Sequence, residues 1–212
     1  MSQKTCYIVE PIAQSGYELL QKADIKTVDA SSSKPECVLA EVGNASAVIT
    51  RDAGFSREAI AAAPHLKVIG NHGTGVDPVD VDYATSRSIP VVNTPGANAQ
   101  SVVEHTLAML LSVVKQLRPS DEAVRRADDA FKFRTTFYEL SGKTAAIVGF
   151  GTIGRAVANA LSRGLNMKIV VHSPSADRSS VENLGYQKID SLEEAVARAH
   201  VVSLHLPLRH ST

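Results

Sequence analysis

The sequence contains very little cysteine, and its positive and negative charges cancel. Cys6 and Cys37 are too few for a disulfide framework, and no Cys-x-x-Cys pair or Cys/His cluster indicates a metal site. Twenty-two Lys and Arg residues balance twenty-two Asp and Glu residues, so no overall field attracts nucleic acid or an anionic membrane surface. We therefore expect neither a metal nor a nucleic-acid partner, and the sparse cysteine fits a reducing compartment.

Long hydrophobic runs are missing as well. The first ten residues lack the apolar core of a secretory signal peptide, and no stretch reaches the ~18 consecutive apolar residues of a membrane span. With 44% hydrophobic residues, the 212-residue chain can still bury a substantial core, and it is long enough for one large domain or two small ones. These features predict a soluble, cytoplasmic protein.

Short apolar runs alternate with helical patterns in the first half of the chain, which indicates a parallel α/β sheet. Ser15 and Ser101 each precede a glutamate by three positions, so each predicts a capping box at a helix start. A turn-forming cluster at 93–98 predicts a hinge that separates a domain over 1–98 from a domain over 99–212. The runs that predict strands are 5–9, 25–28, 47–50, 68–69 and 89–93, and the pattern 56–63 predicts a helix that Pro64 stops.

The second half begins with a helical pattern over 102–117 that is apolar on nearly every side, which predicts burial between domains or subunits. Residues 118–140 show no clean period, so they form either an arm for a dimer contact or a surface loop. The following pattern predicts strands over 144–148, 167–172 and 201–206 and helices over 153–164 and 192–198. Only one mononucleotide half is present, so one edge of this sheet is expected to be uncovered.

A glycine-rich turn directly after strand 144–148 is the most informative feature. Gly149 permits a tight turn, Gly151 leaves room for a pyrophosphate against bare backbone, and Gly154 lets the next helix lie close to the strand. The unpaired N–H groups at the start of that helix then form an anion site. The alternative is a glycine-rich turn that merely packs.

Several motifs occur in a fixed order along the chain, and together they are very specific: NHGTGVDPVD at 71–80, VNTPGAN at 92–98, SVVEH at 101–105, GFGTIG at 149–154 and HLPLRHST at 205–212. In these motifs the chain resembles the D-isomer-specific 2-hydroxyacid dehydrogenases. The resemblance implies an α/β fold in which a flavodoxin-like parallel-sheet substrate domain precedes the first half of a Rossmann dinucleotide-binding domain. It also implies NAD(P)-linked interconversion of a small 2-oxo acid and a D-2-hydroxy acid.

The resemblance assigns roles to individual residues. It places Gly73, Thr74 and Gly75 near the substrate carboxylate and the nicotinamide, and two glycines around a threonine after a strand can also form an anion-holding nest. The alternative for this stretch is a tight turn before a helix. Arg51 resembles the family's substrate-side arginine, whose planar fork suits a carboxylate or a phosphate, although a solvated loop arginine fits its position too. For the cofactor, Thr152 and Ile153 resemble the residues that meet the pyrophosphate, and Leu206, Pro207 and Thr212 resemble the adenosine-side wall and a ribose contact.

The sequence departs from the family where an acidic residue usually binds the adenosine ribose. Ser173 occupies that place, and no carboxylate there repels a 2′-phosphate. Ser173, Ser175 and Arg178 could hydrogen-bond such a phosphate, so NADP is expected to be tolerated. Asp177 lies four residues beyond Ser173 and keeps NAD open as the cofactor.

No catalytic residue is predicted within the chain. The resemblance places the family's catalytic arginine, glutamate and histidine beyond the position that matches Thr212, so residues 1–212 are expected to be part of a longer enzyme or an inactive truncation. Glu104 and His105 form a tempting pair, but in the family this pair is not the acid–base dyad, so a structural role is favoured. The alternatives are a corepressor-like dinucleotide-binding protein, which lacks a visible peptide groove here, and a formate dehydrogenase, whose longer N-terminal region has no counterpart. The expected protein partner is a second copy, through residues 101–140.

Overall fold

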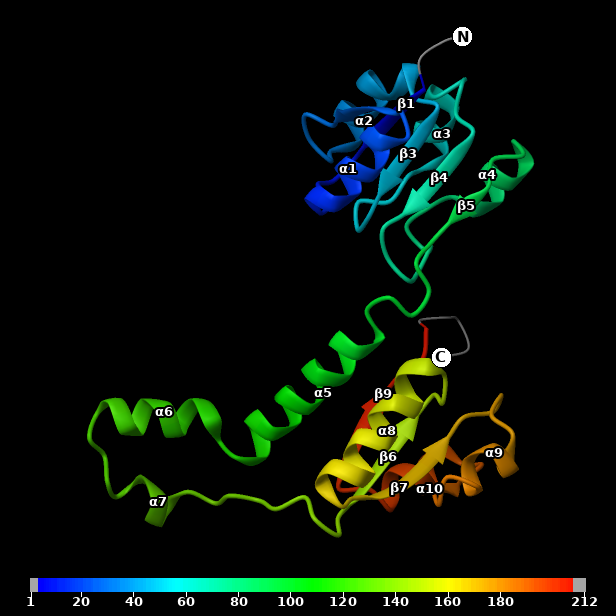
Figure 1. Ribbon diagram of the computed structural model, residues 1–212. Coiled ribbons are helices and arrows are strands. Elements are labelled where there is room, and N and C mark those ends of the chain that lie inside the picture. The colour runs from blue at the N-terminus through cyan, green and yellow to red at the C-terminus, as the bar shows by residue number, and fades with distance from the viewer. Residues whose placement is uncertain (1–3, 208–212) are drawn as a thin grey trace. The chain divides into compact units, whose positions relative to one another are not determined.

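The computed structural model describes residues 4–207, which fold into two compact units that divide between Ala97 and Asn98. Each unit is built on its own parallel sheet with helices packed against it (Figure 1). No helix within residues 4–207 combines the length and hydropathy that a membrane crossing requires.

The sheet of unit 1 has five parallel strands in the order β2-β1-β3-β4-β5, which is the flavodoxin-like order. Its strands are β1 (Thr5–Ile8), β2 (Lys26–Asp29), β3 (Ala47–Thr50), β4 (Val68–Asn71) and β5 (Val91–Val92). Its helices are α1 (Gln14–Lys22), α2 (Pro35–Glu41), α3 (Arg57–Ala62) and α4 (Val81–Ser86), with one 3-10 turn at Val42–Asn44. The predicted strands in this half are all present, with ends that differ by at most two residues.

The interior of unit 1 explains why these short segments are stable. Tyr7, Val48 and Ile69 lie side by side on the central strands and are almost completely buried. They pack in one cluster with Val38 of α2 and Ile60 of α3. Strands covered on both faces become continuously apolar, as β1 is. This core fixes the carboxyl ends of β1, β3 and β4 at one edge of the sheet.

Unit 2 carries a four-stranded parallel sheet in the order β8-β7-β6-β9. By order of appearance this is 3-2-1-4, the first four strands of the doubly wound dinucleotide-binding sheet. The strands are β6 (Thr144–Val148), β7 (Lys168–His172), β8 (Gln187–Lys188) and β9 (Val201–Leu204). The helices are α5 (Ala99–Val114), α6 (Leu117–Arg125), α7 (Phe131–Arg134), α8 (Thr152–Leu165), α9 (Arg178–Glu182) and α10 (Leu192–Ala197). The predicted α/β fold class is confirmed in both units.

The central strand β6 is the most deeply buried element of unit 2. Residues from α5 and α8 cluster with Ile147 on one face, and Ala195 of α10 packs with Ala146 on the other. The outer strand β9 is covered less well, since Val202 and Leu204 are exposed. The sheet therefore has the uncovered edge that the sequence predicted.

The two predicted capping boxes are wrong. Helix α1 begins at Gln14 and α5 at Ala99, so Ser15 and Ser101 lie inside helices instead of capping them. Within unit 2 itself, Val103 is the one buried residue of α5, and Met109 and Val113 are more than half exposed, so the burial of this helix between domains or subunits stays a prediction. Residues 118–140 contain most of α6 and all of α7, so they are not simply a surface loop, and their role as an arm for a dimer contact stays a prediction.

Candidate functional site

The glycine turn after β6 is fixed by the backbone of the protein itself. Gly149 has a φ of +91°, and an added Cβ would lie 2.7 Å from the carbonyl carbon of His205. A Cβ at Gly154 would collide with the carbonyl oxygen of Gly149. The positive φ and the close approach at Gly149, and the close approach alone at Gly154, leave room for glycine only at both positions. The tight turn and the close helix packing predicted for these two residues match this geometry.

Gly151 differs from its two neighbours in the motif. A Cβ there would meet no atom within 4 Å, and its φ of −80° is open to any residue. It is the N-cap of the 14-residue helix α8, it makes no side-chain capping bond, and the first turn holds no acidic residue. Within the described part of the chain, the N–H groups of Thr152 and Ile153 at this helix start have no hydrogen-bond acceptor, and they lie next to the open space over Gly151. A helix start of this kind attracts an anion by its N–H groups and its dipole.

The end of β9 borders the same turn. The amide of His205 donates to the carbonyl of Val148 over 2.7 Å, and a Cβ at Gly149 would lie 3.2 Å from the Cβ of Leu206. Leu206 and Pro207 thus follow the strand beside the glycines, where the sequence placed the adenosine-side wall. Thr212 lies outside the described residues. The sequence did not predict the packing of His205 against Gly149, because no sequence pattern signals it.

The ribose-side residues lie at the carboxyl end of β7. Ser173 directly follows the strand and is 5% exposed. The guanidinium of Arg178 donates to Glu182, to the carbonyl of Lys188 and to Asp190, at 3.2, 3.2 and 2.6 Å. An arginine held by three acceptors is poorly placed to meet a phosphate, so this arrangement does not favour the prediction made for Arg178. The role predicted for Ser173 stays a prediction.

In unit 1, the side chains of two asparagines hydrogen-bond to the loop after β4. Asn71 donates its side-chain amide to the carbonyl of Gly75, and Asn93 donates to the carbonyl of Thr74 over 2.7 Å. The carbonyl of Gly73 accepts from the amide of Thr94 over 3.0 Å. These hydrogen bonds fix three successive carbonyls of the loop in place.

The donors of this loop are fewer than the sequence predicted. The N–H of Gly73 is bonded to the carbonyl of Asn71 over 2.8 Å, so it is not part of a nest. The N–H groups of Thr74 and Gly75 have no hydrogen bond within the described part of the chain, and both residues are exposed. Two adjacent free N–H groups can hold one carboxylate. The side-chain oxygen of Asn71 is buried without a partner there, which is costly and marks this loop as polar inside.

Arg51 follows β3 at the same edge of unit 1. Its backbone N–H donates to the carboxylate of Glu10 over 2.9 Å, and its guanidinium donates to the carbonyl of Pro11 over 3.3 Å. The register of β3 and β4 places it beside His72, whose N–H donates to the carbonyl of Thr50. Arg51 and the loop at 73–75 therefore share one edge of the sheet, as the carboxyl ends of parallel strands must.

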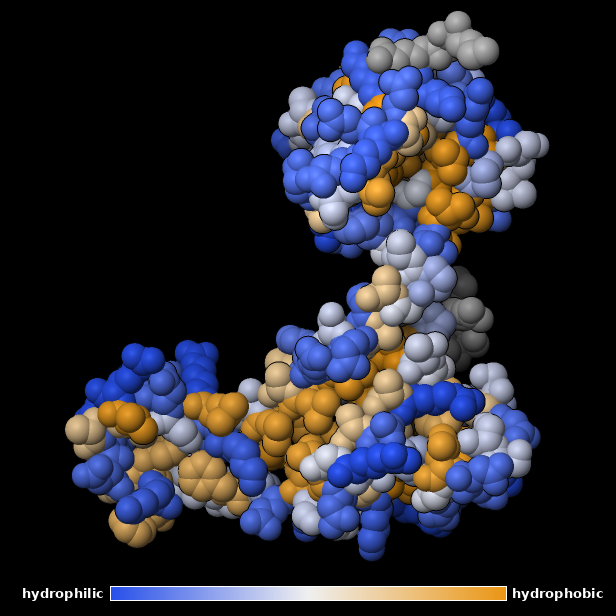
Figure 2. Space-filling model, in the orientation of Figure 1, coloured by the Kyte–Doolittle hydropathy of each residue, from blue (hydrophilic) through white to orange (hydrophobic). Residues whose placement is uncertain are grey.

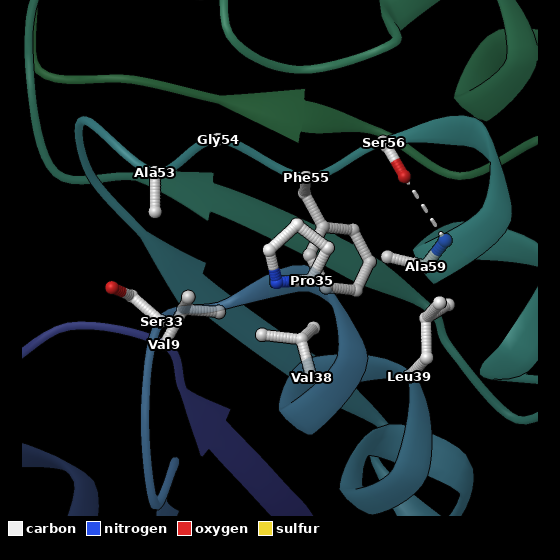
Figure 3. A pocket seen from close by; sticks show the side chains of 10 residues that line it. All are labelled: Val9, Ser33, Pro35, Val38, Leu39, Ala53, Gly54, Phe55, Ser56 and Ala59. Carbon is white, nitrogen blue, oxygen red and sulfur yellow. Dashed lines mark hydrogen bonds between the residues drawn. The ribbon is translucent and has the colours of Figure 1, made fainter.

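Two other features do not extend the site. A crevice of about 50 Å³ lies between α2 and the β3–α3 connection, lined by Val38, Ala53 and Phe55 among others (Figure 3). It has space for a few water molecules but not for a dinucleotide. The carboxylate of Glu104 accepts a hydrogen bond from the side chain of Gln100 on the same helix. No cluster of metal-binding side chains occurs among residues 4–207.

Comparison with known proteins shows which family the chain resembles. The family model for the catalytic domain of D-isomer-specific 2-hydroxyacid dehydrogenases matches residues 6–204. The chain is 35% identical to the D-3-phosphoglycerate dehydrogenase of Mycobacterium tuberculosis over 211 residues, which is 98% of this chain and 39% of that protein. The corresponding enzyme of Archaeoglobus fulgidus is 30% identical over 207 residues, 97% of this chain and 38% of that protein.

Solved structures agree with these matches. A protein of Thermus thermophilus superimposes with a TM-score of 0.84 at 27% identity, over 98% of this chain and 66% of that one. The D-lactate dehydrogenase of Aquifex aeolicus, complexed with NAD and lactic acid, superimposes with a TM-score of 0.85 at 25% identity, over 98% of this chain and 62% of that one. The chain spans less than two fifths of the length of the curated relatives. By its matched residues and its fold, it belongs to the D-isomer-specific 2-hydroxyacid dehydrogenase family.

Proposed function

We propose that the chain forms the dinucleotide-binding and substrate-side parts of an NAD(P)-dependent enzyme that interconverts a 2-oxo acid and a D-2-hydroxy acid. The observation that carries the proposal is the open space over Gly151 at the start of α8, within a turn that Gly149 and Gly154 hold in place. A bound nicotinamide dinucleotide supplies or accepts the hydride. The pyrophosphate of that dinucleotide accepts from the N–H groups of Thr152 and Ile153, while Leu206 and Pro207 border the adenosine.

On the substrate side, the N–H groups of Thr74 and Gly75 bind the carboxylate of the 2-oxo acid. Asn71 and Asn93 position these groups through the carbonyls of Gly75 and Thr74. The guanidinium of Arg51 offers a second site for a carboxylate or a phosphate. Fixed N–H groups bind a carboxylate in one orientation, and orientation is a large part of what such an enzyme contributes. No acid that protonates the carbonyl oxygen is assigned to residues 4–207.

The proposed protein partner is a second copy, through α5, α6 and α7. Helix α6 and the segment after it extend from the sheet of unit 2, and Figure 2 shows apolar surface over α5 and α6. Val124 and Phe133 are 80% and 83% exposed, and Tyr138 is also exposed. An apolar surface of this kind, flanked by charged side chains, is typical of a protein interface. Cys6 and Cys37 are free thiols, which supports a cytoplasmic location.

Cofactor oxidation tests the proposed activity. The naturally produced protein is mixed with NADH or NADPH and with glyoxylate, pyruvate, hydroxypyruvate or its 3-phosphate, and absorbance at the nicotinamide band is followed. We expect turnover with at least one 2-oxo acid and a product of D configuration. Dinucleotide binding without turnover on any of these acids would favour a nucleotide-binding protein of the same fold. No binding of either dinucleotide would overturn the proposal.

A further inference from the structure

The carboxylate of Asp190 follows β8 at the same edge of the sheet at which Ser173 follows β7. Val171 of β7 pairs with Lys188 of β8, and the N–H of Ile189 donates to the carbonyl of Val171 over 2.9 Å. This bond makes Ile189 the register partner of His172, because a parallel ladder links each N–H to the residue before its partner. Ser173 and Asp190 are the next residues along the two chains, just beyond the paired parts of β7 and β8.

Asp190 and Ser173 also leave the sheet on the same face. Side chains alternate along a strand, and register partners point to the same side. Ile169 and Val171 belong to the cluster that packs against α8, so Ser173, two residues further, lies on that face. Ile189 belongs to the opposite cluster with α10, so its neighbour Asp190 lies on the face of Ser173. This is the face from which α8 presents its helix start.

The charges around Asp190 leave a negative balance. Its carboxylate contacts Arg178 at 2.6 Å and Lys188 at 3.4 Å, and Glu182 contacts Arg178 at 3.2 Å. The carboxylate of Asp177 accepts from the amide of Ser180 at the start of α9 and is used as the helix cap. The group therefore contains two cationic side chains and three carboxylates, and the guanidinium of Arg178 is already hydrogen-bonded. Asp190 is exposed and keeps lone pairs for a further donor.

We propose that Asp190 selects NAD over NADP, by accepting a hydrogen bond from the ribose 2′-hydroxyl, repelling a 2′-phosphate and keeping Arg178 away from that phosphate. The carboxylate that the sequence lacks at Ser173 is thus supplied from the segment that follows β8. The inference rests on the proposed dinucleotide site and reverses the expectation, drawn from Ser173 and Arg178, that NADP is tolerated.

Calorimetric titration of the full chain with NADH and NADPH separately tests the inference without requiring turnover. We expect the wild type to bind NADH at least about tenfold more tightly than NADPH, since a charge-assisted contact and a like-charge repulsion act together. Asp190→Asn removes the charged partner in the shortest of the three contacts of Arg178 and removes the repulsion, so NADPH binding tightens about tenfold and NADH binding weakens severalfold. Adding Arg178→Gln to this variant removes the gain for NADPH.

Asp121→Asn is the matched control, because Asp121 forms an equally exposed ion pair with Arg125 on α6, away from β7 and β8. This variant should leave both affinities unchanged, and thermal unfolding verifies that every variant is folded. An unchanged ratio of the two affinities in Asp190→Asn, or a wild type that prefers NADPH, would overturn the inference while the proposed dinucleotide site stands. If neither dinucleotide binds the wild type, the proposed function itself fails, and with it the inference.

Discussion

At the scale of single residues, the three glycines of the turn separate folding from binding. Gly149 and Gly154 are required by the backbone, because a side chain at either would strike the main chain at His205 or at Gly149. Gly151 is required by nothing in the protein, since the space above it is open. Because packing within the protein does not require glycine at position 151, this glycine indicates that a ligand approaches the backbone there.

Replacing Gly151 with valine should therefore abolish dinucleotide binding and leave the fold intact. The branched side chain would fill the open space in which the pyrophosphate approaches the helix start. Gly164→Val is the control, because Gly164 lies on the same helix and a Cβ there also meets no atom within 4 Å. Titration with NADH should show no binding to the first variant and normal binding to the second. Equal affinities would remove the main support for the dinucleotide site.

The stability of unit 2 should depend on pH through His205. Burial lowers the pKa of its imidazole, and Nε2 lies 2.8 Å from the hydroxyl oxygen of Ser203. With a lowered pKa in the folded state, the unfolded chain takes up a proton first as the pH falls. Unit 2 should therefore lose stability as the pH drops below about 6.5, the ordinary value for histidine.

Urea unfolding at pH 7.5 and pH 5.5 measures this effect, and His205→Gln is the comparison, since glutamine has no proton to gain in this range. The variant should lose less stability than the wild type between the two pH values. Identical losses would show that His205 is not the group responsible. His65→Gln, an exposed histidine in unit 1, should not change the loss in unit 2.

At the scale of elements, the sequence predicted which segments are strands far better than where helices begin. Ser56 is a true N-cap, since its hydroxyl accepts from the amide of Ala59 over 3.3 Å. Ser15 carries the same sequence signature but lies within α1, after an N-cap at Ala13. A capping signature describes side-chain chemistry, whereas the helix start is set by where the backbone leaves the extended region.

This contrast predicts different effects for the same substitution in unit 1. Ser56→Ala removes a capping bond and should destabilise unit 1 by about 1 kcal/mol. Ser15→Ala removes no capping bond and places a better helix former in an exposed position of α1. The stability of unit 1 in this variant should therefore be unchanged or slightly higher. Chemical denaturation of the two variants, followed by far-ultraviolet circular dichroism, compares them. A loss of similar size for both would contradict the assignment of the helix starts.

Other parts of the site could not be predicted from the sequence for a related reason. The motif at 149–154 carries its own geometry, so the turn and the helix start followed from the residues alone. Asp190 escaped notice because its nearness to Ser173 depends on the register of β8, a strand of two residues with no pattern of its own. Arg178 was predicted from its charge, but the acceptors that hold it lie up to twelve residues away. Contacts across strands become visible only in the folded chain.

At the scale of the whole molecule, the exposed apolar side chains of the α6 and α7 segment set the expected assembly. Val124 lies on α6 and Phe133 on α7, and both are more exposed than almost any other large apolar side chain described. Burying both in an interface with a second copy would remove apolar area from water at about 25 cal/mol per Å². Monomeric proteins rarely keep such side chains together in solvent.

We therefore expect the 212-residue chain to self-associate and the variant Val124→Glu/Phe133→Glu to do so at least about tenfold more weakly, because two charges would be buried without partners. Sedimentation equilibrium over a range of concentrations gives both association constants. Leu19→Glu is the control, since Leu19 is 67% exposed on α1 and belongs to neither helix. It should leave association unchanged. Association that survives the double variant, or a wild type that stays monomeric at high concentration, would place the contact elsewhere or remove it.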